Sequence, residues 1–140
     1  MADTFQLQVA TAERLIVDEQ VRQAEIPGKE GYMGILAGHA PLLSALGAGV
    51  LSYDGGRGQQ VLAIAGGFVE VFQNQVSVLA DRAEFGADIQ ADRARQELEQ
   101  ANDALKKAQT ESESDAALKA VQRAQARIDA AGRASSAAHQ

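Results

Sequence analysis

Cysteine and tryptophan are absent from this sequence of 140 residues, and proline occurs only twice. Without cysteine the chain has no disulfide, no thiolate nucleophile and no cysteine-based metal site, so its fold must depend on packing alone. No apolar run approaches the roughly 20 residues that a membrane helix needs, and the first residues lack the basic and apolar segments of a signal peptide. We therefore expect one main core, in a protein that is neither exported nor inserted into a membrane by itself.

Positive charge and histidine are also scarce. The formal net charge is −6 at pH 7 and the isoelectric point is near 4.8, which argues against nucleic acid as a partner. The two histidines, His39 and His139, have no serine or carboxylate at a recognisable catalytic spacing, and no metal-ligand motif is present. These absences together predict a non-catalytic protein without a metal site.

The composition changes near residue 87. Residues 1–87 hold 12 of the 13 glycines, both prolines and all the phenylalanines and tyrosines, which is typical of a β-rich segment. Glycine at 54–58 and polar residues at 73–75 predict hairpin turns. Short apolar runs predict strands at 5–9, 15–17, 21–26, 49–53, 61–65, 68–72 and 76–80, a density that favours a sandwich or a barrel.

Residues 88–140 contain one glycine and no proline and are rich in residues that favour helices. Asp88 is a candidate cap for a first helix, and Ser112 or Ser114 for a second. Both helices carry one apolar stripe, and a short polar loop joins them, so we expect an antiparallel hairpin packed stripe against stripe. The stripes consist of Ala91, Ala94, Leu98, Ala101, Leu105 and Ala108, and of Ala117, Val121, Ala124, Ile128 and Ala131.

Alanine dominates this seam, which limits its strength. A buried alanine methyl contributes about 1 kcal/mol or less, and ordering each residue costs a comparable amount. The helices can nevertheless persist when separated, because their propensity is local. We expect a hairpin that can open while each helix remains helical.

Basic residues gather in the second helix. Lys119, Arg123 and Arg127 are spaced i, i+4, i+8 and therefore project from one face, here called the basic ridge. The ridge is either a solvated face that keeps an alanine-rich helix soluble or a surface for an acidic helix or a polyanion.

Three segments of the β-rich half carry a family resemblance: GYMGILAGHAPLL at 31–43, IAGGFVEV at 64–71 and VSVLADRAE at 76–84. At the same spacing they resemble the epsilon subunit of bacterial-type F-type (F1Fo) ATP synthases, and the likeness spans nearly the whole chain. The resemblance implies an α+β fold, with an N-terminal flattened β-sandwich domain at 1–87 and a C-terminal antiparallel two-helix hairpin at 88–140.

The same resemblance implies a non-catalytic rotor subunit of the central stalk that couples proton translocation through the c-ring to ATP synthesis. Its partners would be the gamma subunit and the c-ring, and the complex would hold it at the cytoplasmic face of the bacterial plasma membrane. Two positions depart from the family pattern: Ala37 replaces the usual proline, and Tyr32 replaces a residue that is often acidic. The implied contact loop contains Glu30, Tyr32, Met33, His39 and Pro41.

In the family the hairpin regulates the enzyme. Docked on the sandwich it permits ATP hydrolysis, and extended along gamma it reaches the catalytic alpha and beta subunits and inhibits hydrolysis. The resemblance thus implies that the basic ridge of Lys119, Arg123 and Arg127 is the inhibitory surface.

Some family members bind ATP as a regulatory ligand through an Ile/Leu-Asp-x-x-Arg-Ala motif. Here Gln90 replaces the aspartate, and a lost acceptor is worth about 1–3 kcal/mol, so we expect weak binding at most and no other cofactor. The implied nucleotide-binding residues are Glu84, Ile89, Arg93, Ala94, Arg123 and Arg127.

Two other interpretations stay open on the sequence. The chain could be a free-standing β-sandwich adaptor that recruits a partner through its hairpin, which co-purification would distinguish. It could hydrolyse ATP itself, although no phosphate-cradling loop or catalytic base is visible.

Overall fold

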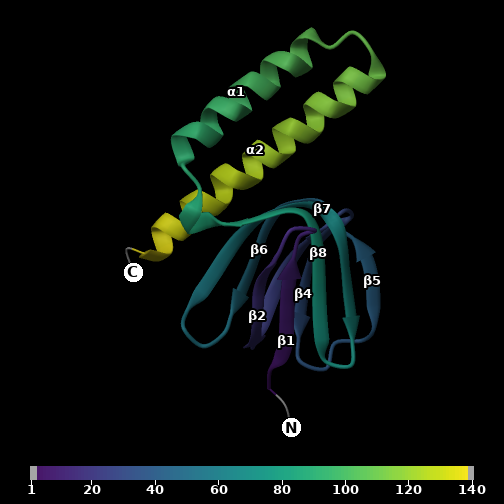
Figure 1. Ribbon diagram of the computed structural model, residues 1–140, viewed down its shortest axis with the longest axis vertical. Helices are drawn as coiled ribbons and strands as arrows, with labels where there is room; N and C mark the ends of the chain where they lie inside the picture. Colours follow the sequence, from purple (N-terminus) through teal and green to yellow (C-terminus); the bar gives the residue numbers. More distant parts are fainter. Residues whose placement is uncertain (1–2, 139–140) are drawn as a thin grey trace.

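The computed structural model describes residues 3–138, and side chains as far as residue 136, so His139 lies outside the described residues. Eight strands are followed by a short 3-10 helix and two α-helices (Figure 1). The strands are β1 (Phe5–Ala10), β2 (Leu15–Val21), β3 (Gln23–Gly28), β4 (Gly31–Leu36), β5 (Leu42–Ala45), β6 (Ala48–Asp54), β7 (Gln59–Phe72) and β8 (Gln75–Phe85).

The strands form one sheet in the order β2-β1-β8-β7-β6-β3-β4, with β5 added to β7. The sheet folds over itself because β7 bends at Gly66 and Gly67: the part before the bend pairs with β6, and the part after it pairs with β5. Their φ angles of 73° and 111° favour glycine, and a Cβ on Gly67 would lie 2.1 Å from the carbonyl oxygen of Leu79. The predicted sandwich, followed by two helices, is confirmed.

Several strand boundaries differ from the prediction. Arg22 separates β2 from β3, so the predicted strand at 21–26 is two strands. The predicted strands at 61–65 and 68–72 are one bent strand, β7. Strands β4 and β5 were not predicted, because glycine and proline in this region are more typical of loops. Both predicted hairpin turns are present, and Gln73 and Asn74 adopt the positive φ of a tight turn.

The main core lies between the two halves of the folded sheet. Every second side chain along a strand points into it. In β1, for example, Phe5, Leu7 and Val9 are buried. Within the described residues, no helical side chain belongs to this core. Tyr53 is also buried there, and this burial, followed by the charge and hydrogen bonding of Glu19, raises the pKa of Tyr53 to about 12. The sandwich therefore has a complete core without the hairpin.

The helices α1 (Ala91–Lys107) and α2 (Glu111–Ala138) form the predicted antiparallel hairpin. The predicted N-caps, Asp88 for the first helix and Ser112 or Ser114 for the second, are wrong. Asp88 lies in the 3-10 helix η1 (Gly86–Asp88), and α1 begins after Gln90 without a side-chain cap. At α2 the cap is Thr110, whose Oγ1 accepts a hydrogen bond of 3.1 Å from the Glu113 N–H. Threonine at this position satisfies an otherwise free amide of the first turn.

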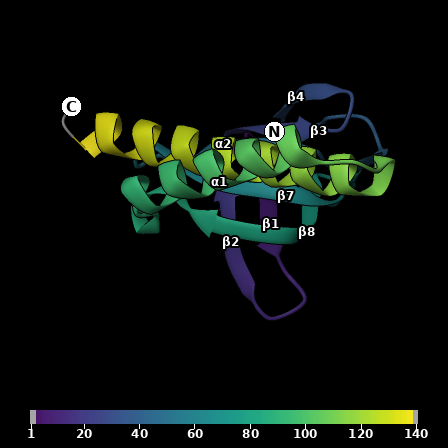
Figure 2. The same cartoon turned by 90° about the horizontal axis from the view of Figure 1, so that it is seen from above.

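The hairpin lies at the end of the sandwich opposite the start of β1, with α2 nearer to the strands (Figure 1). Seen from above, the helices lie across β7 (Figure 2). A second, smaller apolar cluster fills this junction and joins α2 to β6 and β7. Its buried members are Val50, Val61, Ala63, Ile89, Ala94, Ala126, Ala130 and Ala131.

Glycine permits the closest approach of α2 to the sandwich. A Cβ on Gly86 would lie 2.3 Å from the carbonyl oxygen of Ala130 and 3.0 Å from Val61. Ala126 and Ala130 thus form a second buried face of α2, in addition to the stripe that faces α1. The spacing of apolar residues in the sequence predicted only the stripe.

Candidate functional site

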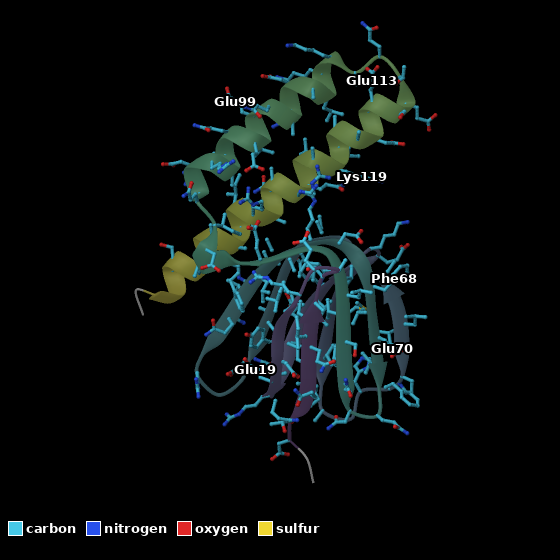
Figure 3. The ribbon with its side chains drawn as sticks, viewed as in Figure 1. Glu19, Phe68, Glu70, Glu99, Glu113 and Lys119 are labelled. Atoms are coloured by element: carbon cyan, nitrogen blue, oxygen red, sulfur yellow. The ribbon has the colours of Figure 1, made fainter. Side chains whose placement is uncertain are left out.

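The basic ridge is not uniformly exposed in the compact hairpin. Lys119 is exposed on α2, whereas Arg123 and Arg127 are partly buried. Figure 3 shows Lys119 part-way along α2, between the α1–α2 loop and the sandwich end of the helix. The three residues lie on one helix face as the sequence predicts, but the sandwich and α1 cover part of that face.

Arg127 lies between two carboxylates from different elements. Its Nε donates to Glu84 Oε1 of β8 at 2.5 Å, and its Nη1 donates to Glu97 Oε1 of α1. The Arg127 side chain is 23% exposed, and those of Glu84 and Glu97 are 39% and 43% exposed. Burial lowers the pKa of the Arg127 guanidinium, but the hydrogen bonds and charges of the two glutamates outweigh it, and the net pKa is raised above the ordinary arginine value.

These three residues line a cleft of about 500 Å³ between the hairpin and the sandwich. Its floor comes from β7 and β8, one wall from the β1–β2 turn, and the roof from the two helices. Four acidic and four basic side chains line it, so it carries little net charge. Its charged lining residues are Glu13, Arg14, Asp81, Arg82, Glu84, Glu97, Arg123 and Arg127.

The structure brings together half of the predicted nucleotide-binding residues. Glu84, Arg123 and Arg127 line the cleft. Ile89 and Ala94 are buried in the apolar cluster under the hairpin. Arg93 is exposed and is not a lining residue of this cleft. Spacing along the chain did not reveal that Arg127 already has two acidic partners.

The predicted contact loop is not a single loop. Residues 31–36 form β4, an edge strand whose only partner among the described strands is β3. Glu30 is exposed and precedes this strand, whereas His39 and Pro41 follow it. The length of the strand, about 17 Å, therefore separates Glu30 from His39 and Pro41. Met33 is partly buried against the main core. Any contact made by the whole segment must therefore run along the sheet edge.

Tyr32 has a structural role in β4. The residue is 55% exposed, but its hydroxyl accepts a hydrogen bond of 2.9 Å from the Val50 N–H. A Cβ on Gly49 would lie 2.5 Å from this hydroxyl, so glycine is needed beneath it. Tyr32 thus links the edge strand β4 to a backbone amide of β6.

The turn that contains His39 is tied to the far end of the sandwich. The Gly38 N–H donates to Asn74 Oδ1 at 2.9 Å, and Asn74 Nδ2 donates to the Thr4 carbonyl oxygen at 2.7 Å. The imidazole Nδ1 of His39 lies 2.8 Å from the Ala40 carbonyl oxygen. These contacts give the turn a defined shape at the β7–β8 end.

The sandwich carries an exposed apolar face that was not predicted from the sequence. Leu43, Phe68, Phe72 and Leu79 are each more than half exposed, and strand pairing places them on the outer face of β5, β7 and β8. Phe68 and Glu70 extend from the flank of the sandwich in Figure 3. We call this set of four side chains the apolar face. The sequence of β7 contains these exposed phenylalanines, but apolar residues occupy both faces of this strand. The alternation of apolar and polar residues that would separate an exposed face from a buried one is therefore missing.

Within residues 3–138, no group of three or more histidines, cysteines and carboxylates could hold a metal ion. In the same range no helix is long and apolar enough to cross a membrane.

Known proteins resemble this chain over most of its length. The family described as the ATP synthase delta/epsilon chain beta-sandwich domain matches residues 4–86. The ATP synthase epsilon chain of Solibacter usitatus is 44% identical over 129 residues, which cover 91% of this chain and 96% of that one. The ATP synthase epsilon chain of a Synechocystis species is 40% identical over 132 residues, covering 92% and 97%.

Solved structures resemble the fold. A chain in the Euglena gracilis mitochondrial ATP synthase OSCP/F1/c-ring structure superposes with a TM-score of 0.81 at 24% identity, covering 94% of this chain and 82% of that one. A chain in the Tetrahymena thermophila mitochondrial ATP synthase central stalk/c-ring structure gives a TM-score of 0.68 at 15% identity, covering 89% and 94%.

Proposed function

Because this chain belongs to the ATP synthase delta/epsilon chain family, as a non-catalytic epsilon subunit, we propose that it couples the catalytic head to the membrane rotor. In this role it turns with the central stalk, so that proton translocation through the c-ring drives ATP synthesis. The complex holds it at the cytoplasmic face of a bacterial plasma membrane. A free-standing adaptor is disfavoured, because relatives along nearly the whole chain are ATP synthase epsilon chains.

The sandwich has two surfaces suited to the rotor. We assign the apolar face to the gamma subunit, because four exposed apolar side chains on a rigid sheet gain most from burial in a permanent complex. We assign the edge at Glu30, Tyr32, Met33, His39 and Pro41 to contacts with the c-ring and gamma, running along β4.

The hairpin is proposed to inhibit ATP hydrolysis when it leaves the sandwich and reaches the catalytic alpha and beta subunits. The observation that carries this proposal is the junction itself. Alanine supplies most of its helical side, and the main core is complete without it, so the hairpin can detach without unfolding the sandwich. The basic ridge would then meet acidic helices of the beta subunits.

ATP hydrolysis by the reconstituted catalytic head tests the inhibitory role. The head is measured with the full chain and with a chain that ends at Ala87, whose main core is intact. We expect higher hydrolysis with the shorter chain. Equal rates, with both chains bound to gamma equally well, would restrict the protein to coupling.

ATP binding in the cleft is a second candidate role, supported by the convergence of Glu84, Arg123 and Arg127. Binding should be weak, because Nε and Nη1 of Arg127 already donate to the carboxylates of Glu84 and Glu97, which compete with a phosphate for this guanidinium. Calorimetric titration with ATP checks it, with Arg123→Gln as the comparison. A saturable signal that is lost in the variant supports a regulatory nucleotide, and no saturable signal in the millimolar range rejects one.

A further inference from the structure

Three separate elements meet at one guanidinium in the compact protein. Arg127 belongs to α2, Glu84 to the end of β8 and Glu97 to α1. We propose that Glu84, Arg127 and Glu97 form an ion-pair latch that keeps the hairpin compact and withholds Arg127 from the catalytic head until the latch breaks. This inference rests on the proposed inhibitory role and adds how that role is controlled.

The latch differs from the other ion pair of the described residues. Arg95 pairs with Asp92, which lies three residues earlier on the same helix, so this pair does not join two different elements. The Arg127 pairs span 43 and 30 residues of sequence and join different elements. Because Arg127 is only 23% exposed, solvent screens its pairs less than those of a surface arginine.

Few other polar contacts hold the hairpin on the sandwich. Among the described side chains, the remaining hydrogen bond between these parts runs from Arg133 Nη2 to Gln59 Oε1, at 3.3 Å between exposed groups. The apolar contribution comes largely from alanine, and each methyl contributes little. The bond from Arg127 to Glu84 is therefore a large share of the polar attachment to the sandwich, and the bond to Glu97 adds to the packing of α2 on α1.

One residue cannot serve both states at once. In the compact state, Nε and Nη1 of Arg127 are occupied by carboxylates of the same chain. In the extended state the proposed ridge needs this guanidinium for the beta subunit. Lys119 and Arg123 form no ion pair within the described residues. Arg127 thus makes the ridge complete only after the latch has opened.

Distances between two spin labels in the isolated full-length protein test the latch directly. The chain contains no cysteine, so Arg57→Cys on the sandwich and Gln122→Cys on α2 give unique labelling sites. The test variants are Glu84→Gln with Glu97→Gln, and Arg127→Gln. The matched control is Asp92→Asn, which removes a carboxylate charge and an ion pair from α1 without affecting any contact between elements.

We expect the double glutamine variant and Arg127→Gln each to raise the population at long label distance about tenfold. Asp92→Asn should leave the distribution unchanged. The latch is overturned by an unchanged distribution in both test variants, by an equal change in Asp92→Asn, or by a parent protein that is already open.

Hydrolysis by the catalytic head then separates the latch from the proposed function. The double glutamine variant frees Arg127 without changing α2, so it should inhibit more strongly than the parent. Arg127→Gln should open the hairpin without this gain in inhibition. If the chain ending at Ala87 inhibits as much as the full chain, the inhibitory role fails while the label distances still decide the latch. If truncation relieves inhibition but neither test variant opens, the latch alone fails.

Discussion

Replacing Gly86 with alanine should detach the hairpin while leaving the sandwich folded. Gly86 begins the short helix η1 and lies against the backbone of α2. Its φ is not in the positive region, so alanine fits the local backbone. The added methyl group would clash mainly with α2: it would lie 2.3 Å from the carbonyl oxygen of Ala130 and 2.8 Å from its carbonyl carbon, and 3.0 Å from Val61 of the sandwich.

The size of the effect follows from these distances. Non-bonded heavy atoms prefer a separation of about 3.5 Å, so the helix must move away by about 1 Å. Backbone atoms of a continuous helix cannot turn aside as a side chain does. Overpacking of this kind typically costs about 1–3 kcal/mol, which corresponds to a roughly 5- to 150-fold decrease in the ratio of docked to undocked hairpin.

Gly132→Ala is the matched control, because a Cβ there has no neighbour within 4 Å. It should strengthen α2 by up to about 1 kcal/mol without moving it. Spin-label distances between α2 and the sandwich, together with thermal unfolding followed by the β-sheet circular dichroism signal, measure both variants. If Gly86→Ala keeps the compact distance distribution, the close approach at Ala130 does not control docking and the reasoning is refuted.

The remaining predictions concern three separate parts of the molecule. The pKa of Tyr53 is raised to about 12 from an ordinary value of 10.0, so the stability linked to its proton is complete below pH 10 and lost as pH rises toward 12. Urea unfolding from pH 8 to 11.5 should show a loss of roughly 2 kcal/mol in the free energy of unfolding that Tyr53→Phe lacks, and identical curves would contradict this. Thr110→Ala should destabilise the first turn of α2 by about 1 kcal/mol, seen as faster amide exchange at Glu113, and unchanged exchange would show that the cap contributes nothing. Phe68→Ser should weaken binding to gamma at least about tenfold in calorimetry, with little change in stability. The control is Leu118→Ser on α2, which also replaces an exposed apolar side chain and should bind gamma normally. Equal affinity of the two variants for gamma would show that gamma does not bind the apolar face.

Composition and periodicity predicted the fold well because each half has a single dominant pattern. The change at residue 87 coincides with a change from strands that end at Phe85 to helices that begin at Ala91. Helical stripes were predictable because alanine and leucine recur at fixed spacing on one face. Strands β4 and β5 were not, because their identity depends on pairing with β3 and β7 rather than on their own composition.

The candidate site was less predictable, since its contacts join residues far apart in sequence. The spacing of Lys119, Arg123 and Arg127 predicted a shared face, but no local pattern indicates that Glu84 and Glu97 cover one end of it. The second buried face of α2 was missed for a related reason. Alanine is common on all sides of this helix, so Ala126 and Ala130 differ from exposed alanines only after the sandwich is in place.

The two ion pairs of Arg127 act at different interfaces, and this separates two ways of opening. The pair with Glu84 joins α2 to the sandwich, and the pair with Glu97 joins α2 to α1. Losing the first favours release of the hairpin as a unit, whereas losing the second favours separation of the helices. Both interfaces are rich in alanine, so neither is protected by a large apolar core. A guanidinium shared between them couples the two steps, because moving α2 away from either partner also disturbs the bond to the other. The compact hairpin should therefore open in one concerted transition, whereas a chain lacking one glutamate should open in two.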